Sequence, residues 1–165
     1  MGDVDIKLFD KSEDKKLYRL TSNDNEIYIK IKDISLPFNC QVYNKNLYLN
    51  AELFKSEKSY NENIKIINSF EKCIINKLNL DKNFVSIIKD RNDAIHLKCM
   101  FKRTKNGLVL TTKSKDDTYI DIDIFKLKEA HKLNQKYDII IKPEVLWETE
   151  DSYGITYYLV IIINN

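Results

Sequence analysis

Residues 59–79 read SYNENIKIINSFEKCIINKLN and carry the clearest helical pattern of the chain. Ser59 and Glu62 have the spacing of a capping box, in which each side chain accepts a hydrogen bond from a backbone amide at the helix start. Apolar residues then recur at helical spacing from Ile64 to Leu78. The stretch therefore predicts one helix over about residues 60–79.

Two stretches before this helix alternate apolar with polar residues, which is typical of half-buried strands. They cover residues 27–32 and 47–53. Their outward faces carry two aromatic and two basic side chains: Tyr28, Lys30, Lys32 and Tyr48. The sequence therefore predicts strands whose solvent-exposed faces carry aromatic rings beside positively charged side chains.

Further strands are expected after the helix, over residues 84–89, 95–102, 108–113, 119–125, 137–147 and 154–164. Asn106-Gly107 is typical of a type I′ turn, and it predicts a hairpin that joins the second of these strands to the third. The last strand is apolar on both faces, which indicates a central position in a sheet. Residues 126–136 suit either a short helix or a loop.

A chain of 165 residues with one helix and many short strands indicates a single domain that is mainly β. We place this domain at residues 17–165 and expect a closed or nearly closed barrel. Residues 1–16 are polar, and we interpret them as an arm or an edge strand.

Charge is distributed unevenly along the chain, although the net charge is only +2. Residues 1–60 are neutral, residues 61–115 carry +7 and residues 116–165 carry −5. A basic centre favours a polyanion as partner. The high content of Ile, Lys, Asn and Tyr also fits an A/T-rich genome, which accounts for part of the lysine excess.

The three cysteines, Cys40, Cys73 and Cys99, form no C-x-x-C pair. Their odd number and the absence of a signal-like start lead us to expect a reducing, intracellular location. No apolar run approaches 18 residues, so we expect no membrane segment.

The sequence predicts no catalytic site, no metal site and no cofactor. It has only three glycines and no glycine-rich phosphate loop. His96 and His131 are best interpreted as surface residues. Asp121 and Asp123 project to one face and could share Mg²⁺, but charges on a strand more often keep a sheet edge soluble.

Residues 89–115 give the strongest functional signal, because they hold eight cations against two aspartates. Their outward faces also carry flat or soft groups, His96 and Met100. A single strand of nucleic acid requires cations for phosphates and flat groups for bases. The alternative is a solvated hairpin in a lysine-rich protein, but the exposed Tyr28 and Tyr48 favour binding. The predicted nucleic-acid-binding residues are Tyr28, Lys30, Lys32, Tyr48, Arg91, His96, Lys98, Lys102, Arg103, Lys105 and Lys113.

Trp147 is the only tryptophan. It shares the parity of Ile139, Ile141 and Val145 along its strand. This parity predicts that its ring fills the core or one end of the barrel.

The C-terminal pattern YDIIIKPEVLW (residues 137–147) followed by YGITYY (residues 153–158) resembles single-stranded DNA-binding proteins of large nucleocytoplasmic DNA viruses. Similar phage replication proteins also place an apolar-Trp pair before a strand that starts at glycine. Leu36-Pro37-Phe38 fits their early strands. The resemblance covers about 40 residues in motif. It implies an OB-like closed or partly open β-barrel, in which the helix caps one end.

We therefore expect a non-catalytic, sequence-tolerant protein that binds single-stranded DNA, or RNA, in viral DNA replication, recombination or repair. Its location would be the host cytoplasm, in viral factories, or the host nucleus. The phage proteins carry an acidic C-terminal tail, which this sequence lacks, so its acidic residues 116–151 are the candidate surface for protein partners. The alternative is a virion or scaffold β-barrel that binds proteins, and a homo-oligomer fits either function.

Overall fold

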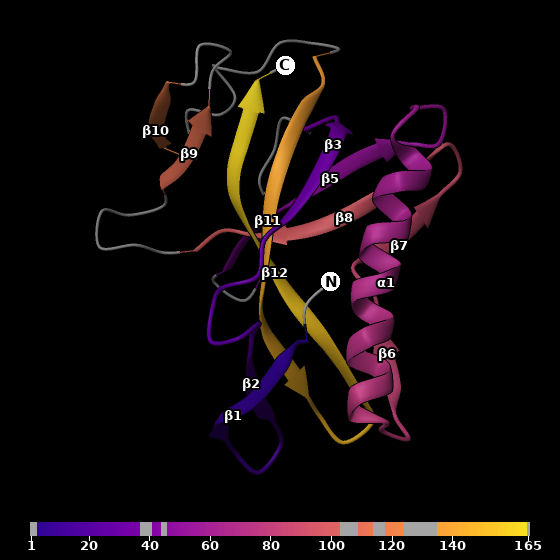
Figure 1. Ribbon diagram of the computed structural model, residues 1–165, viewed down its shortest axis with the longest axis vertical. Helices are drawn as coiled ribbons and strands as arrows, with labels where there is room; N and C mark the ends of the chain where they lie inside the picture. Colours follow the sequence, from indigo (N-terminus) through magenta and orange to yellow (C-terminus); the bar gives the residue numbers. More distant parts are fainter. Residues whose placement is uncertain are drawn as a thin grey trace.

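The computed structural model describes residues 3–36, 41–43, 46–102, 109–113, 118–123 and 135–164. Within them the protein is mainly β with one helix, as predicted (Figure 1). The elements in chain order are β1 (Asp5–Lys11), β2 (Lys16–Thr21), β3 (Ile29–Ile34), β4 (Gln41–Tyr43), β5 (Asn46–Phe54), α1 (Tyr60–Leu78), β6 (Asn83–Val85), β7 (Ile88–Arg91), β8 (Ala94–Met100), β9 (Val109–Lys113), β10 (Tyr119–Asp123), β11 (Tyr137–Glu148) and β12 (Ser152–Asn164).

The twelve described strands belong to one mixed sheet, whose main path is β1-β2-β11-β12-β8-β5-β4. The long strands β11 and β12 pair antiparallel, while β6, β8 and β9 pair with β12 in parallel. The last strand is therefore central, as predicted. Hydrogen bonds between the described strands do not close the sheet, so the predicted OB-like barrel is not confirmed.

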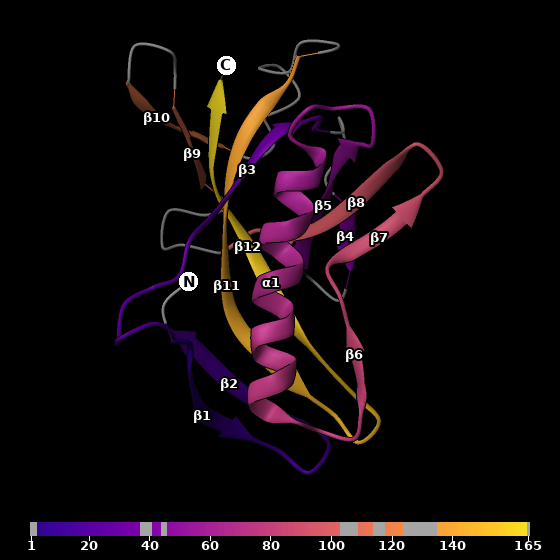
Figure 2. The same ribbon diagram turned by 45° about the vertical axis from the view of Figure 1, so that its right-hand side comes forward.

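The helix covers one face of this sheet. Figures 1 and 2 show α1 running beside β11 and β12, with the β1–β2 hairpin at one end of the molecule and the β9–β10 hairpin at the other. Ile67, Phe70 and Ile74 of α1 are fully buried. The Phe70 ring meets the ring of Tyr157 on β12 edge to face, with centroids 6.4 Å apart. The main core thus lies between α1 and this face.

The helix begins after Ser59, but not through the predicted capping box. No side chain caps its first turn. The Ser59 hydroxyl donates instead to the backbone oxygen of Lys32 on β3 (3.4 Å), and Glu62 pairs with the Lys32 amine at 3.1 Å. The contact with β3 replaces the local contact, so the capping-box interpretation is wrong. The helix ends as predicted, with Asn79 in the left-handed conformation at φ 46°.

Asn63 fastens the start of α1 to β3. Its side chain is buried, accepts from the backbone amide of Lys32 at 3.1 Å and donates to the backbone oxygen of the same residue at 2.9 Å. A third bond reaches the Ser59 hydroxyl. The side-chain amide of Asn63 therefore forms the hydrogen bonds with the backbone of β3 that a neighbouring strand would otherwise form.

Replacing Asn63 with alanine is expected to lower the free energy of unfolding by about 2–3 kcal/mol, because the partly buried backbone N–H and C=O of Lys32 lose their partners. Asn68→Ala changes an exposed asparagine of the same helix and is expected to stay within about 0.5 kcal/mol of the wild type. Urea unfolding followed by circular dichroism measures both. Equal losses in the two variants would show that the link to β3 contributes nothing.

A second buried link joins α1 to the sheet through Glu71. Its carboxylate accepts from the Ser86 hydroxyl (2.6 Å), the Ile87 amide (3.0 Å) and the Tyr157 hydroxyl (3.2 Å). Burial, together with this carboxylate, holds the pKa of Tyr157 well above its usual value. The link therefore ties the helix to β12 and to the segment between β6 and β7.

Glu148, at the end of β11, forms the third link. Its buried carboxylate contacts the amine of Lys82 at 2.7 Å, the hydroxyl of Tyr18 at 2.7 Å and the amine of Lys16 at 3.4 Å. These hydrogen bonds, led by that of Lys82, lower the pKa of Glu148 to about 2. The Glu148 carboxylate therefore connects three segments that are far apart in the sequence: β2, the residues before β6, and β11.

The predicted hairpin between β8 and β9 does not form. β9 pairs with β10 and with β12. One edge of β8 is taken by β5, and the other by β7 and, at Met100, by β12. The prediction is wrong because tertiary neighbours occupy both edges. The Asn106-Gly107 turn, Cys40, His131 and residues 126–134 lie outside the described residues.

The start of the chain forms an edge strand, which is one of the two alternatives that the sequence predicted for residues 1–16. Residues 5–11 form β1 at the end of the sheet path, and β1 pairs with the unpredicted β2. β2 in turn pairs with the last part of β11. These pairings bring the N-terminal residues beside the C-terminal hairpin.

Candidate nucleic-acid interface

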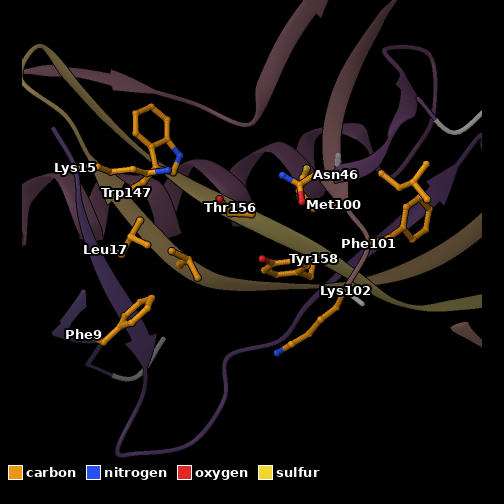
Figure 3. A pocket seen from close by; sticks show the side chains of 12 residues that line it. Phe9, Lys15, Leu17, Asn46, Met100, Phe101, Lys102, Trp147, Thr156 and Tyr158 are labelled. Atoms are coloured by element: carbon orange, nitrogen blue, oxygen red, sulfur yellow. The ribbon is translucent and has the colours of Figure 1, made fainter. Parts of the chain in front are cut away.

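A groove of about 340 Å³ runs over the sheet face opposite α1 (Figure 3). Tyr157 packs under α1, and its neighbour Tyr158 points to the other face, into the groove. We call this site the aromatic groove. It is lined by Phe9, Lys15, Leu17, Asn46, Leu47, Met100, Phe101, Lys102, Val145, Trp147, Thr156 and Tyr158.

Strand register explains how residues so far apart in the sequence share this face. Leu17 of β2 lies opposite Trp147 of β11, and Tyr158 of β12 lies opposite Met100 of β8. Figure 3 shows the Tyr158 ring between the side chains of Phe9 and Leu17 on one side and the side chain of Phe101 on the other. The groove therefore crosses the strands instead of following one of them.

Trp147 belongs to this outer face and not to the core, so its predicted position is wrong. The pairing of β11 with β12 shifts register twice: the shift between Ile140 and Ile141 places one extra residue in β12, and the shift between Pro143 and Val145 places one extra residue in β11. The extra residue in β11 breaks the alternation on which the prediction depends, and Leu146 is buried instead.

Gly154, opposite Trp147 on β12, lets the indole lie close to the sheet. A Cβ atom at residue 154 would stand 2.6 Å from Cζ2 of the ring. Any other residue would push the ring away from β12. The position of Trp147 at the groove thus depends on a glycine.

Among the described residues, three cations lie over aromatic rings on this side of the sheet, an arrangement in which the positive charge is attracted to the ring face. The distances from cation to ring centre are 5.7 Å for Arg19 over Phe9, 5.8 Å for Lys102 over Tyr158 and 4.3 Å for Lys98 over Tyr48. Positive charge and flat surfaces therefore alternate along the groove and beside it.

A chain of opposite charges borders the groove at Tyr158. The Lys102 amine contacts both oxygens of Glu144, at 2.7 and 2.9 Å. Lys142 lies 3.3 Å from Glu144 and also donates to Glu26. Burial opposes the charge of Lys142, but its hydrogen bonds, first to Glu26, raise its pKa. Lys142 therefore stays charged, and the four groups together carry no net charge.

The structure brings three of the predicted site residues together at one end of the groove. Tyr48 lies beside Lys98 and opposite Met100, and Lys102 is the second residue after β8. His96 points to the same side but further along β8, with its Nε2 3.4 Å from a Glu52 oxygen.

Four other predicted residues lie away from this cluster. Lys30 pairs with Asp138 at 2.8 Å, and Lys32 pairs with Glu62 on the helix side. Arg91 pairs with Ala94 at the far end of β8. Tyr28 is 53% exposed in the β2–β3 connection and bonds to Glu26.

Three remaining predicted residues cannot be placed as side chains. Arg103 and Lys105 lie outside the described residues, and of Lys113 only the backbone in β9 is described. The same holds for Asp121 and Asp123 on β10. Among the described residues no group of three or more His, Cys, Asp or Glu side chains could hold a metal ion.

Sequence reasoning missed much of the groove lining: Phe9, Lys15, Leu17, Val145, Thr156 and Tyr158. Residues 16–21 alternate only weakly, so no strand signal marked them.

Among the described residues no helix is long and apolar enough to cross a membrane. No protein-family model matches the chain, and no curated protein matches its sequence. The groove is therefore interpreted from its own chemistry.

Proposed function

We propose that this chain is a non-catalytic protein that binds single-stranded DNA, or RNA, in the aromatic groove with little sequence preference. The observation that carries the proposal is the set of cations placed over aromatic rings on one sheet face. Bases stack on flat side chains while cations neutralise the neighbouring phosphates. Because every base has a flat face, stacking of this kind tolerates any sequence.

We further propose an OB-like fold and a role in viral DNA replication, recombination or repair. The order of elements supports the fold, since strands precede and follow a single helix. The groove supports the role, since its concave face is formed by strands and carries the aromatic side chains that single strands require.

Binding should be visible in the fluorescence of Trp147, the only tryptophan of the chain. A base that stacks in the groove is expected to quench this half-buried indole, so titration with oligo(dT) at low salt should give a saturable decrease. The affinity should fall as salt rises, with a slope of about 0.7 in log units for each phosphate neutralised. A protein that is folded but shows no quenching at low salt would contradict the proposal.

Tyr158→Ala is expected to weaken oligonucleotide binding about 5- to 150-fold, since one stacked base contributes about 1–3 kcal/mol. Tyr60→Ala is the matched control, because it removes a tyrosine at the start of α1, outside the groove lining. Fluorescence anisotropy of a labelled oligo(dT) measures both variants. An equal loss in the two would place the binding surface elsewhere.

Binding of a protein partner is the second candidate function, as expected for a virion or scaffold component. Leu8 on the edge strand β1 is 52% exposed, and its neighbour Phe9 is 49% exposed. Exposed large apolar side chains mark interaction surfaces when they lie together. On this alternative, Leu8→Ser reduces self-association in light scattering and leaves oligonucleotide binding unchanged.

A further inference from the structure

Glu144 lies at the border of the groove, beside Lys102, at a place that suits a phosphate group. Its two carboxylate oxygens face the Lys102 amine, at 2.7 and 2.9 Å. That amine also lies 5.8 Å from the centre of the Tyr158 ring. A backbone phosphate next to a base stacked on Tyr158 needs this same cation.

Glu144 is also held so that it can leave Lys102 at low cost. Its side chain is largely buried and lies 3.3 Å from the Lys142 amine, which is buried as well. Lys142 is anchored in turn by Glu26. When Lys102 turns to another anion, the carboxylate keeps a charged partner and is not left unpaired, which would be costly for a buried group.

We propose that Glu144 is an internal competitor that occupies Lys102 in the free protein and is exchanged for a strand phosphate on binding. The inference rests on the proposed function and adds a means by which the groove limits its own affinity. In the free protein the charges of Lys102, Lys142, Glu144 and Glu26 cancel. The groove therefore attracts a strand at this point only after the exchange.

The test is the salt dependence of oligo(dT) binding by the full chain carrying Glu144→Gln, measured by anisotropy of a labelled oligonucleotide. The substitution gives this cluster a net charge of +1, so one further phosphate is neutralised. We expect the slope of log affinity against log salt to steepen by about 0.7, which is about a fivefold gain at 0.1 M salt.

Glu62→Gln is the matched control. It makes the same change in net charge and also frees a lysine, Lys32, whose amine lies 3.1 and 3.2 Å from the two oxygens of Glu62. This pair joins β3 to α1 and lies outside the groove lining. We expect Glu62→Gln to leave both the affinity and the slope within about twofold of the wild type.

Lys102→Gln separates competition for Lys102 from a general effect of charge. If Glu144 acts by occupying Lys102, the fivefold gain from Glu144→Gln falls below about twofold when Lys102→Gln is also present. Lys102 has an exposed side chain, so the single variant Lys102→Gln is expected to fold. If Glu144→Gln is unstable, Glu144→Asp takes its place in both backgrounds. Its shorter side chain draws the carboxylate back from Lys102, so it should give a smaller gain of the same sign.

The outcomes distinguish the competitor from the proposed function. A wild type that binds oligo(dT) while Glu144→Gln has the same slope and affinity overturns the competitor and leaves the function intact. A gain that persists in full without Lys102, or that Glu62→Gln reproduces, also overturns it. If neither the wild type nor Glu144→Gln binds at low salt, the proposed function itself falls.

Discussion

Replacing Glu71 with alanine is expected to lower the free energy of unfolding by about 3–5 kcal/mol, a large part of the stability of an ordinary domain. The carboxylate is 4% exposed and accepts three hydrogen bonds. Its removal leaves the Ile87 amide and the Tyr157 hydroxyl buried without an acceptor, at about 1–3 kcal/mol each. The cavity left by the side chain adds to this loss.

Two variants show whether the loss comes from these hydrogen bonds. Tyr157→Phe removes one donor and leaves the carboxylate with two, so it should cost only about 1 kcal/mol. Glu71→Gln keeps one side-chain oxygen as an acceptor and should fall between the two. Urea unfolding at pH 7 measures all three. If Glu71→Ala is no worse than Tyr157→Phe, the carboxylate does not hold α1 to the sheet.

The Glu148 carboxylate is expected to make the free energy of unfolding fall as the pH is lowered. Its pKa in the folded protein is about 2, against an ordinary value of 4.5. A carboxyl group whose pKa is lowered by folding stabilises the protein above its unfolded pKa and loses this effect as pH falls toward its folded pKa. The contribution is on the order of 3 kcal/mol at pH 7 and declines from about pH 5 down to about pH 2.

Glu148→Gln removes this dependence. At pH 7 the variant is expected to be less stable than the wild type by about 3 kcal/mol, because Lys82 and Lys16 lose the charge that they face. The difference between the two proteins should shrink as pH is lowered from 5 to 3. Denaturant unfolding at several pH values measures it, with Glu150→Gln, an exposed neighbour, as control. A difference that stays constant with pH would contradict the assignment.

Local patterns predicted the elements that depend on nearest neighbours. The helix over residues 60–79, the strand that begins near residue 95 and the long C-terminal strands all follow from periodicity, and the structure has them. Burial raises the pKa of the Cys99 thiol to about 12, so this cysteine behaves as a small apolar residue.

Pairings between distant segments could not be predicted in the same way. The extra residue in β11 between Pro143 and Val145 reverses the faces of later residues, so Trp147 was assigned to the core. The lysines of β3 were grouped with the site, although carboxylates from α1 and β11 pair with them. Of the predicted site, Tyr48, Lys98 and Lys102 lie near the groove. The other half of the groove comes from β1, β2 and β12. Which of their side chains face the groove depends on the register of these strands.

The central position of β12 has a consequence for the order of folding. This strand supplies partners to β6, β8, β9 and β11, and its Tyr157 receives both Phe70 and Glu71 of α1. During synthesis the earlier strands and the helix therefore emerge from the ribosome with apolar faces that have no partner yet. Such a topology closes many long loops in one late step, which slows folding and leaves unpaired strands open to aggregation until β12 arrives.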